Sequence, residues 1–219
     1  MMLTKFFKSK KNNVSEQNVQ VYEETPLILK QNVPIYLKIE EETSEYVGWT
    51  YDDKKNGKGV VTYKNGSKYD GNWEDDVKHG NGKFTWKSGG MYEGEYKKGK
   101  MDGTGRKVWG SGNWEGDIYR GEWKNGKKHG KGIYTWKSGS VYDGSWKDDK
   151  RCGKGRRIWK KNGKSVGQYI GSWKDDKRNG IGKIVWEDGN TYKGRWKDNK
   201  RIENEKLIKK MMNWFRTGI

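Results

Sequence analysis

A Tyr-x-Gly tripeptide recurs at nearly regular intervals along most of the chain. It begins at Tyr46, Tyr69, Tyr92, Tyr119, Tyr142, Tyr169 and Tyr192, with steps of 23 or 27 residues. Self-similarity of this length is the signature of a repeat architecture, in which each unit packs only against its neighbours. The sequence therefore predicts a stack of seven equivalent units over residues 46–202.

Each unit has the pattern of a β-hairpin. Tyr142, Gly144 and Trp146 alternate with other residues, and this period of two indicates a strand. A polar loop of five residues follows (KDDKR in this unit), then a second period-two stretch and a turn sequence such as KNG or KSG. We expect an all-β chain, an elongated and twisted antiparallel meander of about seven hairpins, or about fourteen strands.

The predicted core consists of aromatic rings and glycine. Thirteen Trp and 13 Tyr accompany 32 Gly, whereas only 30% of the residues are hydrophobic. Two glycine columns recur, one from Gly48 to Gly194 and one from Gly57 to Gly180. Because glycine ordinarily weakens a strand, we expect both columns to make room for Trp and Tyr rings from adjoining strands.

The two histidines and the cysteine, which are the candidate catalytic or metal-binding residues, occupy the same position in their repeats. Ten residues after each tyrosine the chain has Asn56, His79, Asp102, His129, Cys152, Asn179 and Ile202. A catalytic set needs different residues that converge on one point, whereas equivalent residues recur one unit apart. We therefore expect no catalytic residue, no metal site and no cofactor, and a protein that is not an enzyme.

These units resemble the MORN repeat (membrane occupation and recognition nexus). The stretch YRGEWKNGKKHGKGIYTW, from Tyr119 to Trp136, follows its pattern nearly throughout. The resemblance covers about residues 46–202, with a degenerate first unit (Thr50 replaces Trp) and a degenerate last unit (Glu203 and Glu205 replace glycines). MORN arrays serve in junctophilin-like membrane tethers, in cytoskeletal and ciliary scaffolds, and beside lipid kinase or methyltransferase domains. No kinase or methyltransferase motif accompanies the repeats here.

The segments before the repeats differ from them in charge. Residues 1–18 are predicted to be a disordered basic tail, and residues 19–45 an N-terminal cap with short strands at Leu27–Leu29 and Ile35–Ile39. This cap would cover the first strand edge, because an open edge invites aggregation. Its acidity could also meet the basic end of a second copy, so a homo-oligomer is a further expectation.

Residues 203–219 change to a helical period. Leu207, Ile208, Met211, Met212 and Phe215 recur on one face among basic residues, which predicts an amphipathic helix. Three alternatives stay open: a cap on the last repeat, a ligand for the groove of a partner protein, or a contact with an anionic membrane. The candidate partner-binding residues are Lys206, Lys209, Lys210, Met211, Trp214 and Phe215, together with Trp114 in a four-residue insertion between units.

The net charge of the chain favours some classes of partner over others. Lys and Arg outnumber Asp and Glu by 47 to 29, a net charge of +18, which favours anionic partners. We expect a protein-interaction scaffold in a cytoskeletal or ciliary assembly, with a peripheral adaptor on anionic phospholipid as the alternative. Nucleic acid is disfavoured because the rings are expected to be packed. A single cysteine indicates a reducing, intracellular and cytoplasmic location, with the cytoskeleton or cilium as a possible site.

Overall fold

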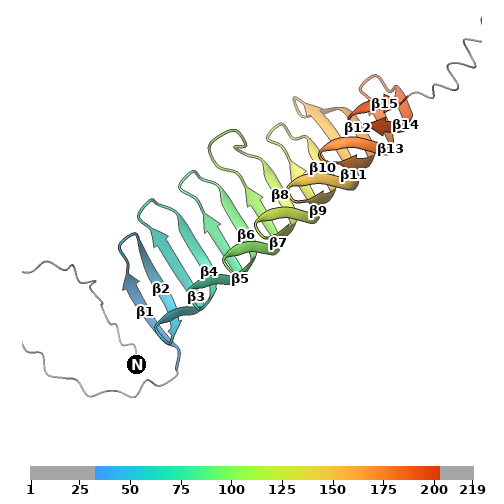
Figure 1. The fold of residues 1–219 in the computed structure, drawn as a ribbon. Helices are drawn as coiled ribbons and strands as arrows, with labels where there is room; N and C mark the ends of the chain where they lie inside the picture. Colours follow the sequence, from blue (N-terminus) through green and yellow to red (C-terminus); the bar gives the residue numbers. More distant parts are fainter. Residues whose placement is uncertain (1–32, 203–219) are drawn as a thin grey trace, which may run out of the picture. The chain divides into compact units, whose positions relative to one another are not determined.

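The computed structural model describes residues 33–202, and these form an all-β chain. The described part holds fifteen strands and no helix. The strands are β1 (Ile35–Glu40), β2 (Ser44–Tyr51), β3 (Lys54–Tyr63), β4 (Lys68–Glu74), β5 (Val77–Thr85), β6 (Met91–Lys97), β7 (Lys100–Val108), β8 (Ile118–Lys124), β9 (Lys127–Thr135), β10 (Val141–Lys147), β11 (Lys150–Lys161), β12 (Lys164–Lys174), β13 (Lys177–Trp186), β14 (Thr191–Lys197) and β15 (Lys200–Ile202) (Figure 1). The predicted tail, the strand at Leu27–Leu29 and the C-terminal helix lie outside the described residues.

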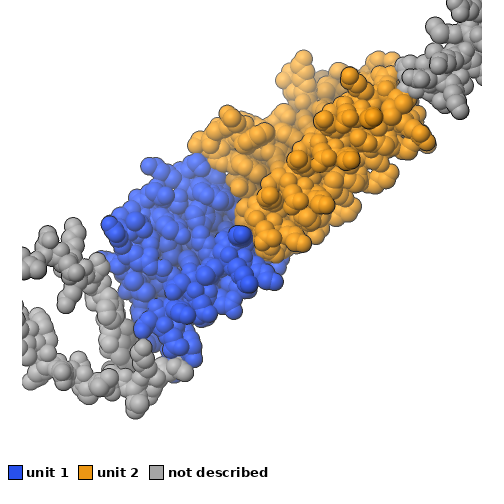
Figure 2. Space-filling view, viewed as in Figure 1, with its two compact units in different colours: residues 1–100 blue, residues 101–219 orange. Residues whose placement is uncertain are grey.

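The chain divides into two compact units, residues 1–100 and residues 101–219 (Figure 2). Within each unit, strands that follow one another along the chain are hydrogen-bonded neighbours, and every pairing is antiparallel. The predicted meander is thereby confirmed. The predicted strand at Ile35–Ile39 is β1, which pairs with β2 and adds one strand to the two expected from each repeat.

The hairpins close through turns that are tighter than the predicted five-residue loop. Strand β10 ends at Lys147 and β11 begins at Lys150, so only Asp148 and Asp149 form the turn. Both have positive φ, 48° and 69°, as expected for a two-residue turn whose twist matches that of the flanking strands. The five-residue loop was wrong because lysines beside the turn continue the strand pairing, with Lys147 opposite Lys150.

The core is a row of tyrosines on one face of the sheet, here called the ring face; the opposite side is the outer face. Tyr119 and Tyr142 are fully buried, and each donates a hydrogen bond from its hydroxyl to the carbonyl three residues later, at 3.0 and 3.1 Å. Trp146 joins consecutive hairpins, since its Nε1 donates to the Gly132 carbonyl at 3.1 Å and its ring meets Tyr119 edge-on at 5.4 Å. The rings therefore supply both apolar burial and fixed hydrogen bonds.

The two glycine columns have different roles. Gly121, of the first predicted column, lies opposite Gly132, and a Cβ on Gly121 would stand 2.8 Å from the Tyr119 hydroxyl oxygen, so this column makes room for the ring. Gly130 and Gly153 belong to the second predicted column, and their φ angles of 55° and 57° place them at bulges in the strand pairing. The second column was therefore misassigned: its members adopt left-handed backbone, and the packing glycine stands two residues later.

Candidate interaction surface

In each of the first six repeats, the ring face keeps one aromatic side chain partly exposed. These residues lie seventeen positions after the repeat tyrosine, near the end of the second strand of each hairpin, and all are half-buried. They are Tyr63 and Trp86 in the first unit, and Trp109, Trp136, Trp159 and Trp186 in the second. We call this set the ring column. It is distinct from the tyrosines and tryptophans that close the core.

A column of cations lies over the rings. Nine residues after the repeat tyrosine, six of the seven units carry Lys or Arg, and the third carries Met101. Each of these cations is held over at least two aromatic rings, at 4.2 to 6.0 Å from the ring centroids. The members of this cation column are Lys55, Lys78, Lys128, Arg151, Arg178 and Arg201. Sequence reasoning missed it, although the same alignment that revealed the histidine and cysteine position contains it.

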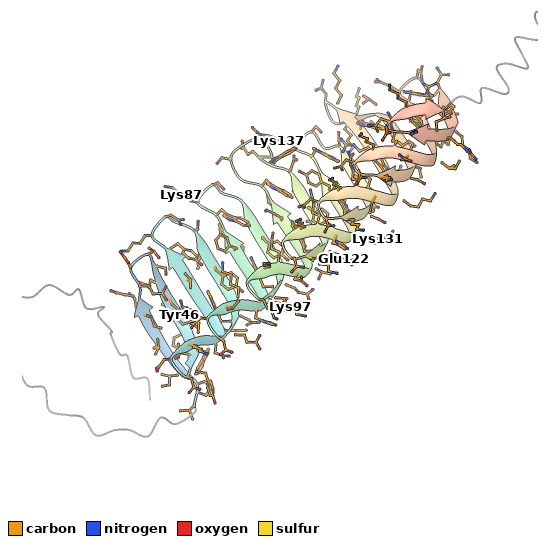
Figure 3. All side chains as sticks on the ribbon, in the orientation of Figure 1. Tyr46, Lys87, Lys97, Glu122, Lys131 and Lys137 are labelled. Atoms are coloured by element: carbon orange, nitrogen blue, oxygen red, sulfur yellow. The ribbon has the colours of Figure 1, made fainter. Side chains whose placement is uncertain are left out.

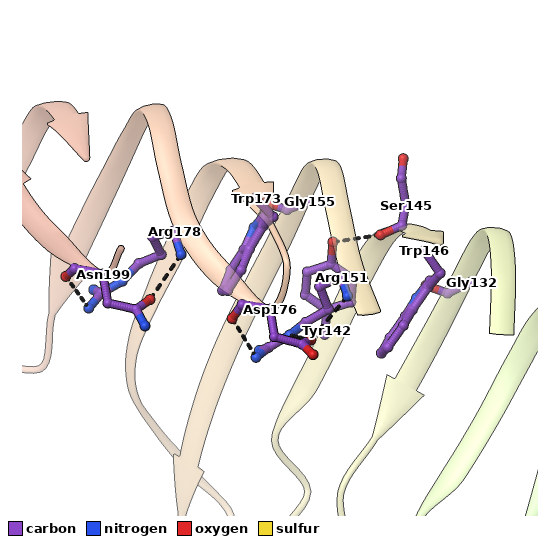
Figure 4. A network of polar contacts seen from close by, with 10 residues as sticks. All are labelled: Gly132, Tyr142, Ser145, Trp146, Arg151, Gly155, Trp173, Asp176, Arg178 and Asn199. Atoms are coloured by element: carbon purple, nitrogen blue, oxygen red, sulfur yellow. Dashed lines mark hydrogen bonds and ion pairs between the residues drawn. The ribbon is translucent and has the colours of Figure 1, made fainter. Parts of the chain in front are cut away.

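The turn of the following hairpin positions two of the arginines (Figure 4). Asp176, in the turn between β12 and β13, accepts hydrogen bonds from the Arg151 backbone nitrogen at 3.0 Å and from its Nε at 2.9 Å. Arg178 is held in the same way by Asn199, through its backbone nitrogen at 2.9 Å and its Nη2 at 3.0 Å. Each turn therefore fixes a cation of the preceding hairpin over its rings.

The second unit contains a stack of two cations and two rings. Lys128 Nζ lies 4.7 Å from the Tyr134 ring centroid, Tyr134 lies 4.6 Å from Trp136, and the Arg157 guanidinium covers Trp136 at 3.2 Å. Buried Asp117 accepts a hydrogen bond from the Tyr134 hydroxyl at 2.5 Å. Arg157 Nε and Nη1 are buried without a hydrogen-bond partner among the described residues. The stack therefore leaves part of a guanidinium without the acceptors that buried charged groups ordinarily have.

The stacked cations are partly removed from water. Burial lowers the pKa of Lys128, and it lowers the pKa of Arg157 to about 10, with repulsion from Arg151 as a smaller cause. Burial likewise lowers the pKa of Lys78 and of Arg178. A positive surface that is already partly desolvated gives up little hydration when a partner covers it, so it suits an acidic or aromatic partner.

Of the residues predicted to bind partners, the structure describes Trp114. It lies in the segment between β7 and β8 and is 57% exposed. Lys206, Lys209, Lys210, Met211, Trp214 and Phe215 lie outside the described residues. The other 27-residue step, from Tyr142 to Tyr169, contains a second four-residue insertion, in the stretch NGKSVGQY. It forms no separate loop: it lengthens β11 and β12, which meet at a tight turn of Asn162 and Gly163 with positive φ angles.

The histidines and the cysteine lie on the second strands of their own hairpins. His79 Nδ1 contacts a Glu74 carboxylate oxygen at 2.5 Å, and Cys152 is half-buried on β11, opposite Ser145. Burial raises the pKa of the Cys152 thiol, which disfavours the nucleophilic thiolate. Residues 33–202 contain no cluster of three or more His, Cys, Asp or Glu side chains arranged to hold a metal ion. They likewise contain no helix of the length and apolar character needed to span a membrane.

Comparison with protein families identifies the repeat. The MORN repeat model matches residues 51–68, 69–91, 92–114, 119–141, 142–164 and 169–191, which together make up more than half of the chain. Five of these six matches begin at a predicted repeat tyrosine; the seventh predicted unit, from Tyr192, lies outside the matched residues and contains β14 and the short β15.

No curated protein matches the chain. Among solved structures, one described as "Streptogramin B lyase structure" matches at 12% identity over 80% of this chain and 73% of that chain. Its TM-score is 0.17, which does not indicate a shared fold.

Proposed function

Because the chain belongs to the MORN-repeat family, whose repeats are general interaction and membrane-binding modules, we propose that it is a non-enzymatic scaffold that binds other proteins. The observation that supports this most is the ring column with its stacked cations. Trp, Tyr and Arg are the residue types that dominate binding energy at protein interfaces. In the second unit the ring face presents partly exposed Trp together with Tyr and Arg, and such a face is suited to an extended partner.

We place the scaffold in a cytoskeletal or ciliary assembly. The support for this assignment is the family resemblance alone, since no residue chemistry on the ring face selects a particular assembly. The cellular location proposed with it is the cytoplasm.

The test is co-purification of the full chain from its native cell, with mass spectrometry of the proteins that stay bound at moderate salt. A variant with Lys128→Gln and Arg157→Gln removes two stacked cations, and Lys127→Gln with Lys150→Gln is the control that removes two exposed lysines. We expect the first variant to lose partners that wild type and control retain, at similar melting temperatures. Identical partner sets for all three proteins would contradict the role of the ring face.

A peripheral adaptor on anionic phospholipid is the second candidate. It is favoured by the turn Lys124–Lys127, in which Asn125 and Gly126 leave two lysines without an acidic neighbour in the turn. The turn Lys147–Lys150 instead encloses Asp148 and Asp149, so its formal charges cancel. Paired aspartates also occupy the turns at residues 52–53, 75–76 and 175–176, so acids dilute the turn cations, and we rank this candidate below the scaffold.

A further inference from the structure

The outer face of β11–β14 carries an arrangement that the ring face does not explain. Arg156, Ile170, Lys183 and Lys193 are exposed and lie directly opposite one another across the four strands. A second row beside it contains Lys154 opposite Ser172, and Ile181 opposite Arg195. These two rows of the described sheet therefore hold five cations, two isoleucines, one serine and no acid.

A shallow groove of about 250 Å³ lies between these side chains. Its walls include Ile170 and Ile181, each 51% exposed, and its lysines are Lys154, Lys183 and Lys193. Glycines of three strands also line it. Two half-exposed isoleucines beside glycine backbone make a depression that an apolar side chain fills from outside.

Most cations of this face have no acid opposite them. Lys183 lies directly opposite Lys193, and like charges in that position destabilise a sheet. The partners of the neighbouring cations are neutral: Lys154 Nζ donates to the Ser172 hydroxyl at 2.9 Å, and Arg156 Nε donates to Gln168 Oε1 at 3.0 Å. Asp143 on β10 lies directly opposite Arg156 and offsets that arginine. The other four cations of the two rows have no acid opposite them in the described strands, so their positive charge is not compensated across the strands.

Other hairpins use the same rows differently. In the first unit Asp70 lies opposite Lys83, which lies opposite Glu93, so that charges alternate in sign. On β8 and β9 the outer-face residue Glu122 accepts a hydrogen bond from the backbone nitrogen of Lys131 at 2.6 Å (Figure 3). An acid-free face is therefore a property of β11–β14 and not of the repeat as such.

We propose that the outer face of β11–β14 is a docking site for an acidic segment of another polypeptide, which seats an apolar side chain between Ile170 and Ile181 and its carboxylates on the surrounding Lys and Arg side chains. The proposal rests on the proposed scaffold function only in that the partner is a protein, and it uses the opposite face of the sheet. An extended peptide of about five residues spans four strands, because the three gaps between the strands measure ~4.8 Å each and an extended chain rises ~3.3 Å per residue.

The cations on both sides of Ile170 favour a polypeptide over a bilayer. Ile170 lies between Arg156 and Lys183, whose side chains are longer than its own. A flat lipid surface would meet the cations first, whereas interfacial membrane binding depends on apolar side chains that enter the headgroup region. A peptide side chain, by contrast, can enter the groove between the cations.

The test uses the full chain and a fluorescein-labelled peptide that repeats Glu-Leu-Asp, with fluorescence anisotropy as the readout. A matched peptide with Gln and Asn in place of the acids measures the contribution of charge. We expect the acidic peptide to bind and the neutral one to bind at least about tenfold more weakly. Ile181→Ser is expected to weaken binding of the acidic peptide without changing the salt dependence of that binding.

Lys193→Glu separates binding from stability. The variant replaces a repulsive pair with an attractive one, so we expect the melting temperature to rise by about 1–3 °C. The same change is expected to lower the affinity for the acidic peptide about tenfold. Lys127→Glu, at an exposed turn position, is expected to leave that affinity within about twofold of the wild-type value. A purely structural role for this face would not raise stability and lower affinity together.

Three outcomes overturn the proposal: no binding of the acidic peptide, equal loss in Lys193→Glu and Lys127→Glu, or binding to phosphatidylserine vesicles that Lys193→Glu abolishes while the peptide does not bind. The ring-face variant Lys128→Gln with Arg157→Gln is expected to bind this peptide normally. Failure of the docking site and failure of the proposed scaffold function are thereby distinguishable.

Discussion

At the scale of single residues, the glycine that lies under a tyrosine ring is the most demanding position. A Cβ on Gly132 would stand 2.3 Å from Tyr119 Oη and 2.5 Å from its Cζ, so neither the ring nor the strand can give way easily. We expect Gly132→Val to cost about 1–3 kcal/mol of folding free energy, as overpacking does. Lys127→Val, at an exposed position, is the control. Thermal melting measures both, and equal melting temperatures would refute ring packing over this glycine.

Cys152 is a contrasting residue, for which we predict little effect. It occupies the same repeat position as Asn56 and Asn179, and burial raises the pKa of its thiol. Cys152→Ser is therefore expected to keep the melting temperature and the partners of the wild type, and the thiol to react slowly with alkylating reagents at neutral pH. A partner lost on this substitution alone would assign Cys152 a role in binding.

Residue types on the ring face were largely predictable, because alternation of Tyr, Gly and Trp can bury only one face of a strand. The role of the second glycine column, to which Gly130 belongs, was not predictable. Gly130 and Gly132 are the same residue type and lie in the same strand. Only the bulge between β8 and β9 gives Gly130 a positive φ and puts Gly132 beneath the Tyr119 ring. The Arg157 guanidinium nitrogens that lack a partner among residues 33–202 depend on packing between hairpins, which a one-dimensional pattern does not contain.

At the scale of the hairpin, the turn acids serve the preceding hairpin as well as their own. Asp176 Oδ1 accepts the backbone nitrogen and Nε of Arg151, whereas Asp175 makes no hydrogen bond with its side chain among the described residues. Both residues have positive φ, 66° and 48°, so substitution by alanine strains both alike. We expect Asp176→Ala to cost about 1–2 kcal/mol more than Asp175→Ala in chemical denaturation. Equal costs would show that these bonds contribute nothing net.

Hairpins were predictable as elements, and their lengths were not. The alternation located both strands of each repeat. The polar residues of KDDKR predicted a five-residue loop, but Lys147 and Lys150 continue the strand pairing. The polar residues of the second insertion likewise suggest a loop from sequence alone. Asn162 and Gly163 allow a turn so tight that the added residues lengthen β11 and β12. A polar side chain indicates that a residue is exposed to solvent, but the backbone of an exposed residue can still pair with a neighbouring strand.

At the scale of the whole molecule, a core of tyrosines predicts loss of stability in alkali. Burial raises the pKa of Tyr46, Tyr69 and Tyr142, so their contribution is complete below the unfolded value of ~10 and falls as pH rises above it. The lowered pKa values of Lys128 and Arg157 act in the opposite sense, but these groups are fewer than the buried tyrosines. We expect guanidinium midpoints to fall between about pH 9 and about pH 11, with phenolate absorbance appearing as the fold is lost. A constant midpoint across that range would contradict the buried-tyrosine core.

Salt separates the two candidate functions, because they draw on the net charge of +18 in different ways. Exposed charges are screened over ~8–10 Å at physiological ionic strength, so attraction of the turn lysines to a bilayer weakens steeply with salt. Contacts to the ring face lose less, because its cations are partly buried over rings that a partner also covers. We therefore expect binding to phosphatidylserine vesicles to be weak, without preference for phosphoinositides, and abolished at physiological salt, while co-purifying proteins are retained. Glutamate at Lys206, Lys209 and Lys210 tests whether the C-terminal segment contributes to the vesicle binding seen at low salt. Selective, sub-micromolar binding to phosphoinositide vesicles at physiological salt would place the membrane adaptor above the scaffold, since screened surface charge alone does not give such affinity.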